Sequence, residues 1–286
     1  MPAIQPSERP PQSLPADNPQ PTTPTPPKIA NPIIELRHIH KRFGRLVVLD
    51  DVSLQIENGS SLVVIGASGT GKSVLLKHIV GLLRPDSGEV LFEGNRIDNL
   101  SERKLMDYRM QIGFLFQMGA LFDSMTAGEN VAFPLRQHSN KSAEEVTERV
   151  RQRLAMVGLP DAAPKMPGEL SGGQRKRVAL ARAIALDPKA ILYDEPTTGL
   201  DPIRSDIINE LILKLQRELK VTSIVVTHDM HSAMKIADRI VMLHQGKLVF
   251  DGTPEEIRAS QESVVRRFVL GEASDEELAQ LREPTK

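Results

Sequence analysis

Residues 61–83 decide the fold of this chain, and they read SLVVIGASGTGKSVLLKHIVGLL. The run 61–65 is short and apolar, as a buried strand is, while the residues from 72 onward have helical period. Residues 66–73 between them match G-x-x-x-x-G-K-[ST], the pattern of a phosphate-binding loop (P-loop), in the strand–loop–helix context that this loop requires. A Gly-rich turn that matched by chance would lack this context. The residues expected to contact the nucleotide are Gly66, Ala67, Ser68, Gly69, Thr70, Gly71, Lys72 and Ser73.

The P-loop offers two kinds of group to a bound triphosphate. Its glycines let backbone N–H groups wrap the phosphates, and Lys72 places a positive charge between the β- and γ-phosphates. The Ser73 hydroxyl is suited to Mg²⁺, which prefers oxygen ligands. We therefore expect a nucleoside triphosphate with Mg²⁺ at this loop.

The segments around the P-loop indicate an α/β sheet that helices cover on both faces, because apolar strands alternate with helices. No internal repeat is present, which favours a single nucleotide-binding unit. We expect strands at 33–43, 46–56, 61–66, 88–94, 189–196 and 222–229, a closing hairpin at 239–252, mostly helix over 101–160, and helices at 72–83, 142–159, 206–219 and 230–237.

The strand AILYD at 190–194 is expected to complete the phosphoryl-transfer site, which needs a second Mg²⁺ anchor and a group that positions the nucleophile. Asp194 ends this strand and is predicted to hold the metal. Glu195 is the candidate general base for a water that attacks the γ-phosphate. Taken alone, the Asp-Glu pair would fit a helix N-cap equally well, but the P-loop favours catalysis.

Three further side chains are candidates on weaker grounds. His228 ends the next apolar strand, so we expect it at the same sheet edge, where it would act as a polar switch that reads the γ-phosphate; a lone His is more often structural. Gln117 follows the strand residues FLF and would reach Mg²⁺ or the attacking water. Phe43 precedes a Gly-containing turn and would stack on adenine, with a place in the core as the alternative.

Composition excludes several classes of protein. The 286 residues carry a net charge of −1, which argues against nucleic acid as the main partner, since phosphate-backbone binding needs a basic face. There are no cysteines, hence no disulfides, thiolate metal sites or Cys nucleophile. No apolar run approaches the roughly 20 residues that span a bilayer, and no signal-peptide core is present, so a soluble or peripheral protein is expected. Residues 1–32 hold eleven of the 21 prolines and predict a disordered tail.

A second anion site is predicted where residues 170–183 read LSGGQRKRVALARA. Ser171, Gly172, Gly173 and Gln174 open a run of helical period, and free N–H groups at a helix start behind small residues attract anions. A domain of this size does not need two separate phosphate sites, so the second one requires an explanation.

The P-loop, LSGGQ, ILYDEP at 191–196 and VVTHD at 225–229, in this order and spacing, resemble the ATP-binding subunit of an ABC transporter. LSGGQ followed by RKRVALARAIALDP is highly specific, since P-loop kinases and GTPases lack it. The resemblance covers about residues 33–255, taken as one ATP-binding domain, with a C-terminal helical extension and tail at 256–286. It implies an α/β, P-loop NTPase fold of the ABC ATPase type, with a RecA-like core, an antiparallel β subdomain and an α-helical signature subdomain, and it implies ATP and Mg²⁺ as cofactors.

The same resemblance explains the second anion site. In that family two ATP-binding domains associate head to tail, so that Ser171, Gly172, Gly173 and Gln174 would act in trans on the nucleotide of a second, identical subunit. Asp201, in TGLDP, would connect the two composite sites. The family more often has Ser-Ala where this chain has Thr198 and Gly199, which leaves the interface geometry slightly open.

A transport function is also implied by the resemblance. ATP would close the dimer, hydrolysis would open it, and Gln117 would relay the change, through a helical segment directly after it, to a separate multi-span membrane permease. Residues 114–136, FLFQMGALFDSMTAGENVAFPLR, closely resemble the branch that serves MCE-type lipid transporters, as do residues 167–203. Within 114–136 the residues that carry the likeness are Phe116, Gly119, Ala120, Leu121 and Phe122.

This branch implies a phospholipid-like cargo, an MCE-domain lipid-binding partner, a small accessory subunit, and a peripheral position at the cytoplasmic face of the bacterial inner membrane. Two alternatives remain at the level of the sequence. One is the ATPase of a polar-solute importer, and the other is an ABC ATPase without a transporter, such as an iron–sulfur assembly factor.

Overall fold

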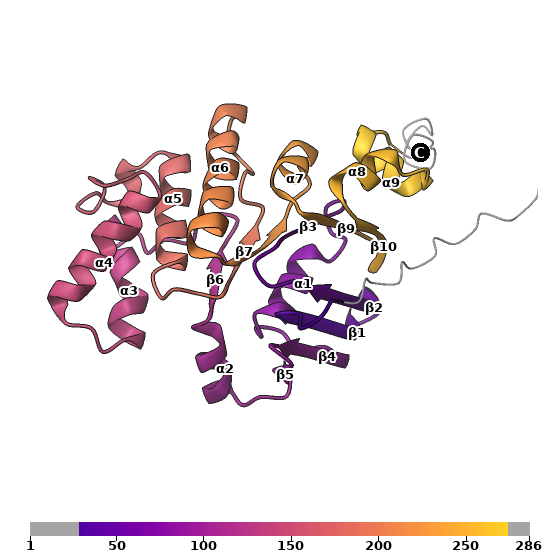
Figure 1. Ribbon diagram of the computed structural model, residues 1–286, viewed down its shortest axis with the longest axis horizontal. Coiled ribbons are helices and arrows are strands. Elements are labelled where there is room, and N and C mark those ends of the chain that lie inside the picture. The colour runs from indigo at the N-terminus through magenta and orange to yellow at the C-terminus, as the bar shows by residue number, and fades with distance from the viewer. Residues whose placement is uncertain (1–28, 274–286) are drawn as a thin grey trace, which may run out of the picture.

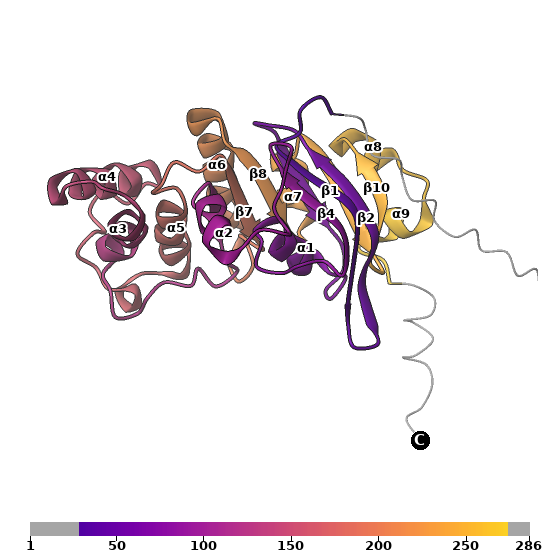
Figure 2. The same cartoon turned by 90° about the horizontal axis from the view of Figure 1, so that it is seen from below.

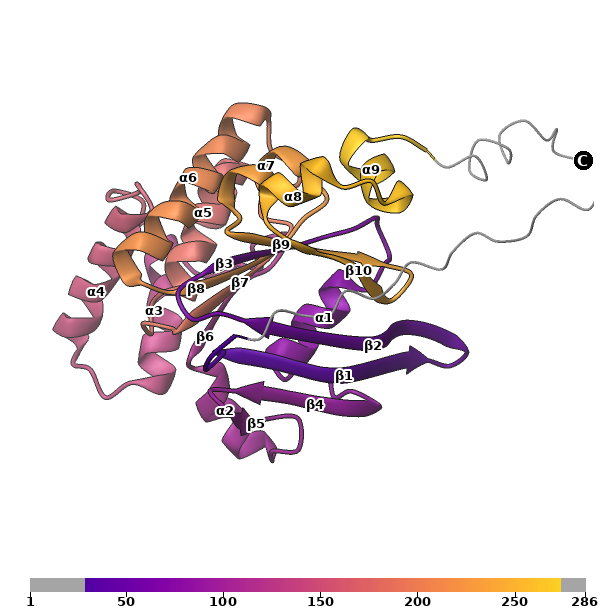
Figure 3. The same ribbon diagram turned by 45° about the vertical axis from the view of Figure 1, so that its right-hand side comes forward.

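The computed structural model describes residues 29–273, and it contains two sheets that face each other across one helix, α1 (Lys72–Ile79), as Figures 1 and 3 show. The larger sheet has the strand order β10-β9-β3-β8-β7-β6. Its inner pairs are parallel, and β10 pairs antiparallel with β9. The strands are β3 (Ser61–Ile65), β6 (Ile112–Leu115), β7 (Ala190–Asp194), β8 (Thr222–Val226), β9 (Arg239–His244) and β10 (Lys247–Gly252).

The central strands are apolar at almost every position because both faces of this sheet are buried. Successive side chains of a strand point to opposite faces. Accordingly Leu62 and Val64 of β3 join the core around α1, while Val63 and Ile65 join the core under the helices of the other face. The P-loop follows directly where β3 ends.

The smaller sheet is antiparallel, with the order β2-β1-β4-β5, and it packs on α1. Its strands form the predicted β subdomain. The expected strands at 33–43, 46–56 and 88–94 appear here. They are β1 (Ile34–Phe43), β2 (Leu46–Ile56), β4 (Ser87–Phe92) and β5 (Asn95–Arg96).

A group of three helices forms the end of the molecule that lies opposite α8 and α9 (Figure 2). They are α3 (Ala127–His138), α4 (Ala143–Met156) and α5 (Gly172–Ala183). Each begins with a capping box, in which the N-cap hydroxyl accepts from the N3 backbone N–H and the N3 side chain reaches back. The N-cap residues are Thr126, Ser142 and Ser171. A short 3₁₀ helix, Pro167–Glu169, leads into α5.

The remaining helices complete the layers around the larger sheet. Helix α2 (Glu102–Arg109) precedes β6, and four helices follow β7 on the sheet face opposite α1 (Figures 1 and 3). Within residues 29–273, no helix combines the length and apolar character needed to cross a bilayer. The four helices are α6 (Pro202–Leu219), α7 (Met230–Ile236), α8 (Pro254–Ala259) and α9 (Ser263–Leu270).

The structure corrects one expectation and leaves others outside its range. The segment directly after Gln117 is a loop over 118–126, and a helix begins only at Ala127. The reason is local: Gly119 and Ala120 both have left-handed backbone (φ 78° and 49°), which a right-handed helix excludes. Most of the predicted tail at 1–32 and the end of the segment at 256–286 lie outside the described residues.

Candidate active site

The P-loop lies at the carboxyl end of β3, where glycine is required at two close approaches. Gly66 has φ 151°, and a Cβ there would lie 2.2 Å from the carbonyl oxygen of Leu243. Gly71 has φ 103°, and a Cβ there would lie 2.8 Å from the carbonyl oxygen of Val48. The loop is therefore held between β9 and β2. Its conformation leaves the first N–H groups of α1 without side-chain caps, as an anion site needs.

Lys72 is folded back over this loop. Its ammonium donates to the carbonyl oxygens of Gly66 and Ala67, each at 2.8 Å. Burial lowers the pKa of Lys72, and the nearby charges of Glu195 and Asp194 oppose that change. A buried cation that only carbonyls satisfy would be stabilised by the negative charge of a phosphate.

Asp194 and Ser73 come together from distant parts of the chain, as the sequence predicted. The Ser73 hydroxyl donates to Oδ1 of Asp194 at 3.0 Å. Burial, with the charge of Glu195 as a further cause, raises the pKa of Asp194, while the Ser73 hydrogen bond lowers it. A carboxylate whose pKa is raised by burial would be stabilised by a bound cation. Its oxygens suit Mg²⁺, which proteins bind through one or two carboxylates while substrate phosphates and waters fill the other ligand positions. Residues 29–273 hold no cluster of three or more His, Cys, Asp or Glu arranged for a metal.

Glu195 is buried and has left-handed backbone, with φ 51°. Its N–H donates to the carbonyl oxygen of Val226 on the neighbouring strand at 2.9 Å. One carboxylate oxygen, Oε2, accepts from the Thr198 hydroxyl at 3.1 Å and lies 2.9 Å from Nδ1 of His228. Non-glycine residues in this conformation cost free energy and cluster at functional sites. No helix starts at the Asp-Glu pair; the next helix, α6, is capped by Asp201. The helix-cap interpretation of this pair is therefore wrong.

His228 follows β8, and the parallel pairing of β7 with β8 brings it beside Glu195. We expect His228→Ala to lower kcat by about 10²-fold, the lower end of what a positioned acid–base group contributes, with little change in nucleotide affinity. Steady-state ATPase kinetics measure both. His231→Ala, which removes an exposed imidazole three residues away, is the matched control. An unchanged kcat in His228→Ala would assign the imidazole a structural role.

Gln117 and Phe43 are both exposed, and no contact in the structure tests the role predicted for either side chain. Gln117 is exposed, two residues beyond β6, and the pairing of Leu115 with Tyr193 puts it at the sheet edge that carries Asp194. Phe43 ends β1, is 50% exposed and lies under the ammonium of Lys41, 5.6 Å from the ring centroid. Its exposure removes the alternative of a core residue.

The signature residues, Ser171 to Gln174 of LSGGQ, form the start of α5, where Ser171 is exposed and Gly173 is buried. Ser171 and Gln174 bond to each other rather than to the P-loop: the Ser171 hydroxyl accepts from the Gln174 N–H at 3.3 Å, and the Gln174 side chain accepts from the Ser171 N–H at 2.9 Å. A Cβ on Gly172 or Gly173 would find no atom nearer than 3.7 Å. These are contacts of ordinary van der Waals length, so the fold of a single chain does not itself require glycine at either position.

Sequence reasoning missed Lys176, which lies on α5 and connects the signature helix to the Glu195 turn. Its ammonium donates to the carbonyl oxygens of Pro196 and Thr198, each at 2.7 Å, and lies 3.4 Å from that of Glu195. Only 7% of the residue is exposed. A lysine on a helix is ordinarily solvated, so no sequence signal distinguished it.

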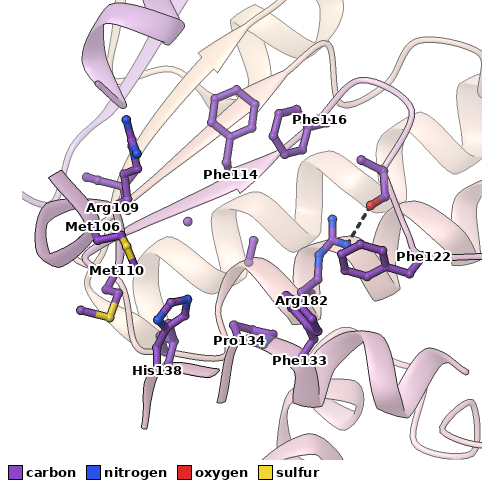
Figure 4. Close-up of a pocket in the computed structure, with 15 residues that line it drawn as sticks. Met106, Arg109, Met110, Phe114, Phe116, Phe122, Phe133, Pro134, His138 and Arg182 are labelled. Atoms are coloured by element: carbon purple, nitrogen blue, oxygen red, sulfur yellow. Dashed lines mark hydrogen bonds between the residues drawn. The ribbon is translucent and has the colours of Figure 1, made fainter. Parts of the chain in front are cut away.

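A cavity of about 450 Å³ lies beside the loop that follows Gln117 (Figure 4). Aromatic rings flank it: Phe114 and Phe116 pack at 4.3 Å between centroids, and Phe122 packs with Phe133 at 4.9 Å. This cavity is lined by three of the five residues whose sequence resembles the lipid branch. Its lining also includes Met106, Arg109, Met110, Pro134, His138 and Arg182.

Arg182 of α5 holds the loop at the edge of this cavity. Its guanidinium donates to the carbonyl oxygens of Ala120 and Gly119, at 2.8 and 3.0 Å, and lies 5.8 Å from the Phe122 centroid (Figure 4). Burial lowers the pKa of Arg182. The same helix that begins with the signature thus orients the loop around the cavity.

Comparison with known proteins agrees with this geometry. The family model described as ABC transporter matches residues 49–198. The intermembrane phospholipid transport system ATP-binding protein MlaF of Haemophilus influenzae is 44% identical over 84% of this chain and 91% of that protein. The Escherichia coli MlaF is 40% identical over 85% and 90%. The probable ribonucleotide transport ATP-binding protein mkl of Mycobacterium leprae is 44% identical over 83% of this chain and 69% of that protein.

Solved structures show the same fold. The ATP-binding cassette MJ0796, in a dimeric post-hydrolysis state with ADP and Pi, superposes with a TM-score of 0.72 at 36% identity, over 77% of this chain and 98% of that one. The cbiO1 protein of Clostridium perfringens, part of the transporter complex cbiONQ, gives a TM-score of 0.75 at 29% identity, over 89% of this chain and 100% of that one.

Proposed function

Because this chain belongs to the family of ABC transporter ATP-binding proteins, which bind and hydrolyse ATP, we propose that it drives the transport of a phospholipid-like cargo between bacterial membranes. The proposed cargo rests on the 44% identity of this chain to an intermembrane phospholipid transport ATP-binding protein, over nearly all of that protein. We further propose that residues 33–255 form the ATP-binding domain and that residues from 256 onward form an extension.

We propose the following roles for the residues of the site. The P-loop N–H groups and Lys72 bind the phosphates, and Ser73, Asp194 and Gln117 would hold Mg²⁺, which supplies charge neutralisation at the phosphate oxygens. Glu195 takes the proton of the attacking water, and His228 orients Glu195 and reads the γ-phosphate. Phe43 stacks on the adenine. The support is the set of contacts among Ser73, Asp194, Glu195 and His228 at one sheet edge.

A second copy of the chain completes the site. In this proposal Ser171, Gly172, Gly173 and Gln174 of one chain close on the γ-phosphate of the other, and Asp201 connects the two sites. The exposure of Ser171 at the start of α5 and the dimeric state of the relative MJ0796 support this arrangement. The Asp201 carboxylate caps α6 by accepting from the Arg204 N–H at 3.0 Å.

The membrane partner is proposed to be a separate multi-span permease, with an MCE-domain lipid-binding protein and a small accessory subunit, at the cytoplasmic face of the inner membrane. The aromatic cavity beside residues 116–122 is the docking place for a segment of the permease, because it is apolar, open and joined through Arg182 to the signature helix. A surface matched to one permease class would specify the partner. Nucleic acid is not among the proposed partners.

The relative mkl supports a second candidate function, since that protein, also 44% identical to this chain, is a probable ribonucleotide transport ATP-binding protein. The deciding experiment is purification of the tagged chain with its membrane complex, followed by mass spectrometry of proteins and small molecules. A permease with an MCE-domain protein and co-purifying phospholipid is the expected result. A soluble-solute binding protein in place of the MCE partner would overturn the lipid assignment.

The docking cavity can be tested with a single charge. Phe122→Glu is expected to reduce co-purification of the permease by about tenfold or more, because burying an unpaired carboxylate in an apolar contact costs more than the roughly 1.4 kcal/mol that a tenfold change requires. Nucleotide binding by the isolated chain should stay unchanged. Leu82→Glu, at a leucine that is 53% exposed and lies outside the cavity lining, is the matched control. Equal recovery of the permease with both variants would place its docking surface elsewhere.

A further inference from the structure

Lys176 makes contacts that the functions proposed above do not use. It is buried on α5 and gives its N–H donors to the backbone of the turn that carries Glu195: the carbonyl oxygens of Pro196 and Thr198 lie at 2.7 Å, and that of Glu195 at 3.4 Å. Three carbonyl oxygens around one ammonium match the three donors of a lysine. The turn is thereby attached to the signature helix.

The turn that Lys176 contacts holds the catalytic carboxylate in a strained conformation. Glu195 has φ 51°, and its N–H is fixed to Val226 of β8. Its side chain is fixed to Thr198 and His228. The left-handed backbone of a glutamate persists only where the surroundings impose it. Lys176 supplies the constraint on the carbonyl side of this residue, from a helix outside the sheet.

The same helix carries the signature at its start. Ser171 caps α5, and Lys176 follows it by five residues, which is about 7.5 Å along the axis at 1.5 Å per residue. Backbone hydrogen bonds join its successive turns, as between the Arg175 N–H and the Ser171 carbonyl oxygen at 2.9 Å, so we treat this segment as one rigid unit. A displacement of the signature end would therefore displace the ammonium and, with it, the Glu195 turn. Leu200 and Arg204, just beyond that turn, also lie within 4 Å of the Cβ positions built on Gly172 and Gly173.

We propose that Lys176 is a positioning residue that couples the signature helix to Glu195 of its own chain, so that nucleotide bound by the partner chain sets the geometry of this chain's catalytic glutamate. The inference rests on the proposed two-chain site, in which the signature contacts the partner's γ-phosphate. It deepens that proposal, because it makes the two composite sites interdependent: occupation of one adjusts the carboxylate that serves the other.

The buried charge agrees with this role. Burial lowers the pKa of Lys176 to about 8, and Glu195, on the turn that the lysine contacts, is the charged group that opposes the change. Because the folded-state pKa lies below the ordinary value of lysine, the cation is lost as the pH rises through about 8, while an unfolded lysine would still be charged. Desolvation of the buried cation costs free energy, and its hydrogen bonds to the three carbonyl oxygens offset part of that cost.

The first substitution removes the positive charge and the N–H donors of the Lys176 side chain together. For Lys176→Met we expect kcat to fall by about tenfold to a hundredfold, since a displacement of about 1 Å at a reacting group can cost 10²-fold. ATP affinity of the isolated chain should stay within about twofold, because the P-loop is untouched, and the Hill coefficient for ATP should fall toward one. Lys165→Met, at an exposed lysine outside this contact, is the matched control. Retention of both kcat and the Hill coefficient would overturn the proposal.

The second test uses Lys176→Gln, which keeps N–H donors but does not titrate, and which covers the case in which the methionine variant does not fold. This variant is expected to have a higher kcat than Lys176→Met and an ATPase rate that does not change through pH 8, where the wild-type rate falls. If the wild-type rate also stays constant through pH 8, and if the glutamine variant has full activity and an unchanged Hill coefficient, then Lys176 is only a structural contact. Dimer formation by Glu195→Gln with ATP is measured alongside: if that dimer fails to form, the two-chain site itself is wrong, whereas a formed dimer with unchanged cooperativity in Lys176→Met removes only this inference.

Discussion

Glu195→Gln is expected to bind MgATP, to lose about 10²–10⁴-fold in turnover, and to accumulate as a closed dimer. The amide has the shape of the carboxylate and keeps an oxygen that accepts from Thr198, whose hydroxyl lies 3.1 Å from Oε2. The fold of the turn should therefore survive. What is lost is the base that takes the proton from water, so the γ-phosphate stays in place and continues to hold the two chains together.

Size-exclusion chromatography with and without ATP measures the dimer, and phosphate release measures turnover. Glu255→Gln, an exposed position on α8, is the matched control and should behave as the wild type does. A Glu195→Gln protein that remains fully active would remove the general-base role. One that is inactive but monomeric with ATP and its membrane partner present would leave the base in place and reject the two-chain site.

Ser171→Arg is expected to abolish hydrolysis by the assembly while each isolated chain still binds ATP. The residue is exposed at the start of α5, where a long cation would block close approach of the signature helix to a second chain. The P-loop of the same chain lies elsewhere and keeps its nucleotide. The substitution also removes an N-cap, which costs about 0.5–2 kcal/mol of stability, so a control for the cap itself is needed.

The chain provides that control in Ser142. It caps α4 in the same capping-box geometry, and its hydroxyl accepts from the Glu145 N–H at 3.2 Å, but it lies away from the signature. Ser142→Arg should lose a similar amount of stability in thermal unfolding and keep its ATPase activity. Comparable activity in the two variants would contradict the trans role of Ser171, and loss of ATP binding in isolated Ser171→Arg would show that Ser171 supports the fold instead.

Much of the candidate site was predictable because its residues lie at the ends of strands or at the start of a helix. The P-loop joins a buried strand to a helix, Asp194 ends β7, and His228 follows β8. The carboxyl ends of parallel strands meet at one sheet edge, so residues at these ends must approach one another wherever the strands are adjacent. The contacts of Asp194 with Ser73 and of Glu195 with His228 confirm that these pairs come together, while their catalytic roles stay predictions.

The sequence by itself determined the fold class and the nucleotide chemistry, since these follow from local patterns that repeat wherever such elements occur, whereas a second chain was implied only by the resemblance to a family. Tertiary structure alone decided the left-handed turn at Glu195, the contact of Lys176 with that turn, the loop over 118–126, and the aromatic cavity beside it. Each of these depends on groups far apart in the chain: Lys176 meets carbonyls twenty and twenty-two residues away, and Arg182 meets Ala120 across sixty-two. Spacing within one segment carries no information about such contacts, because they exist only after the sheet has brought separate helices and turns to the same place.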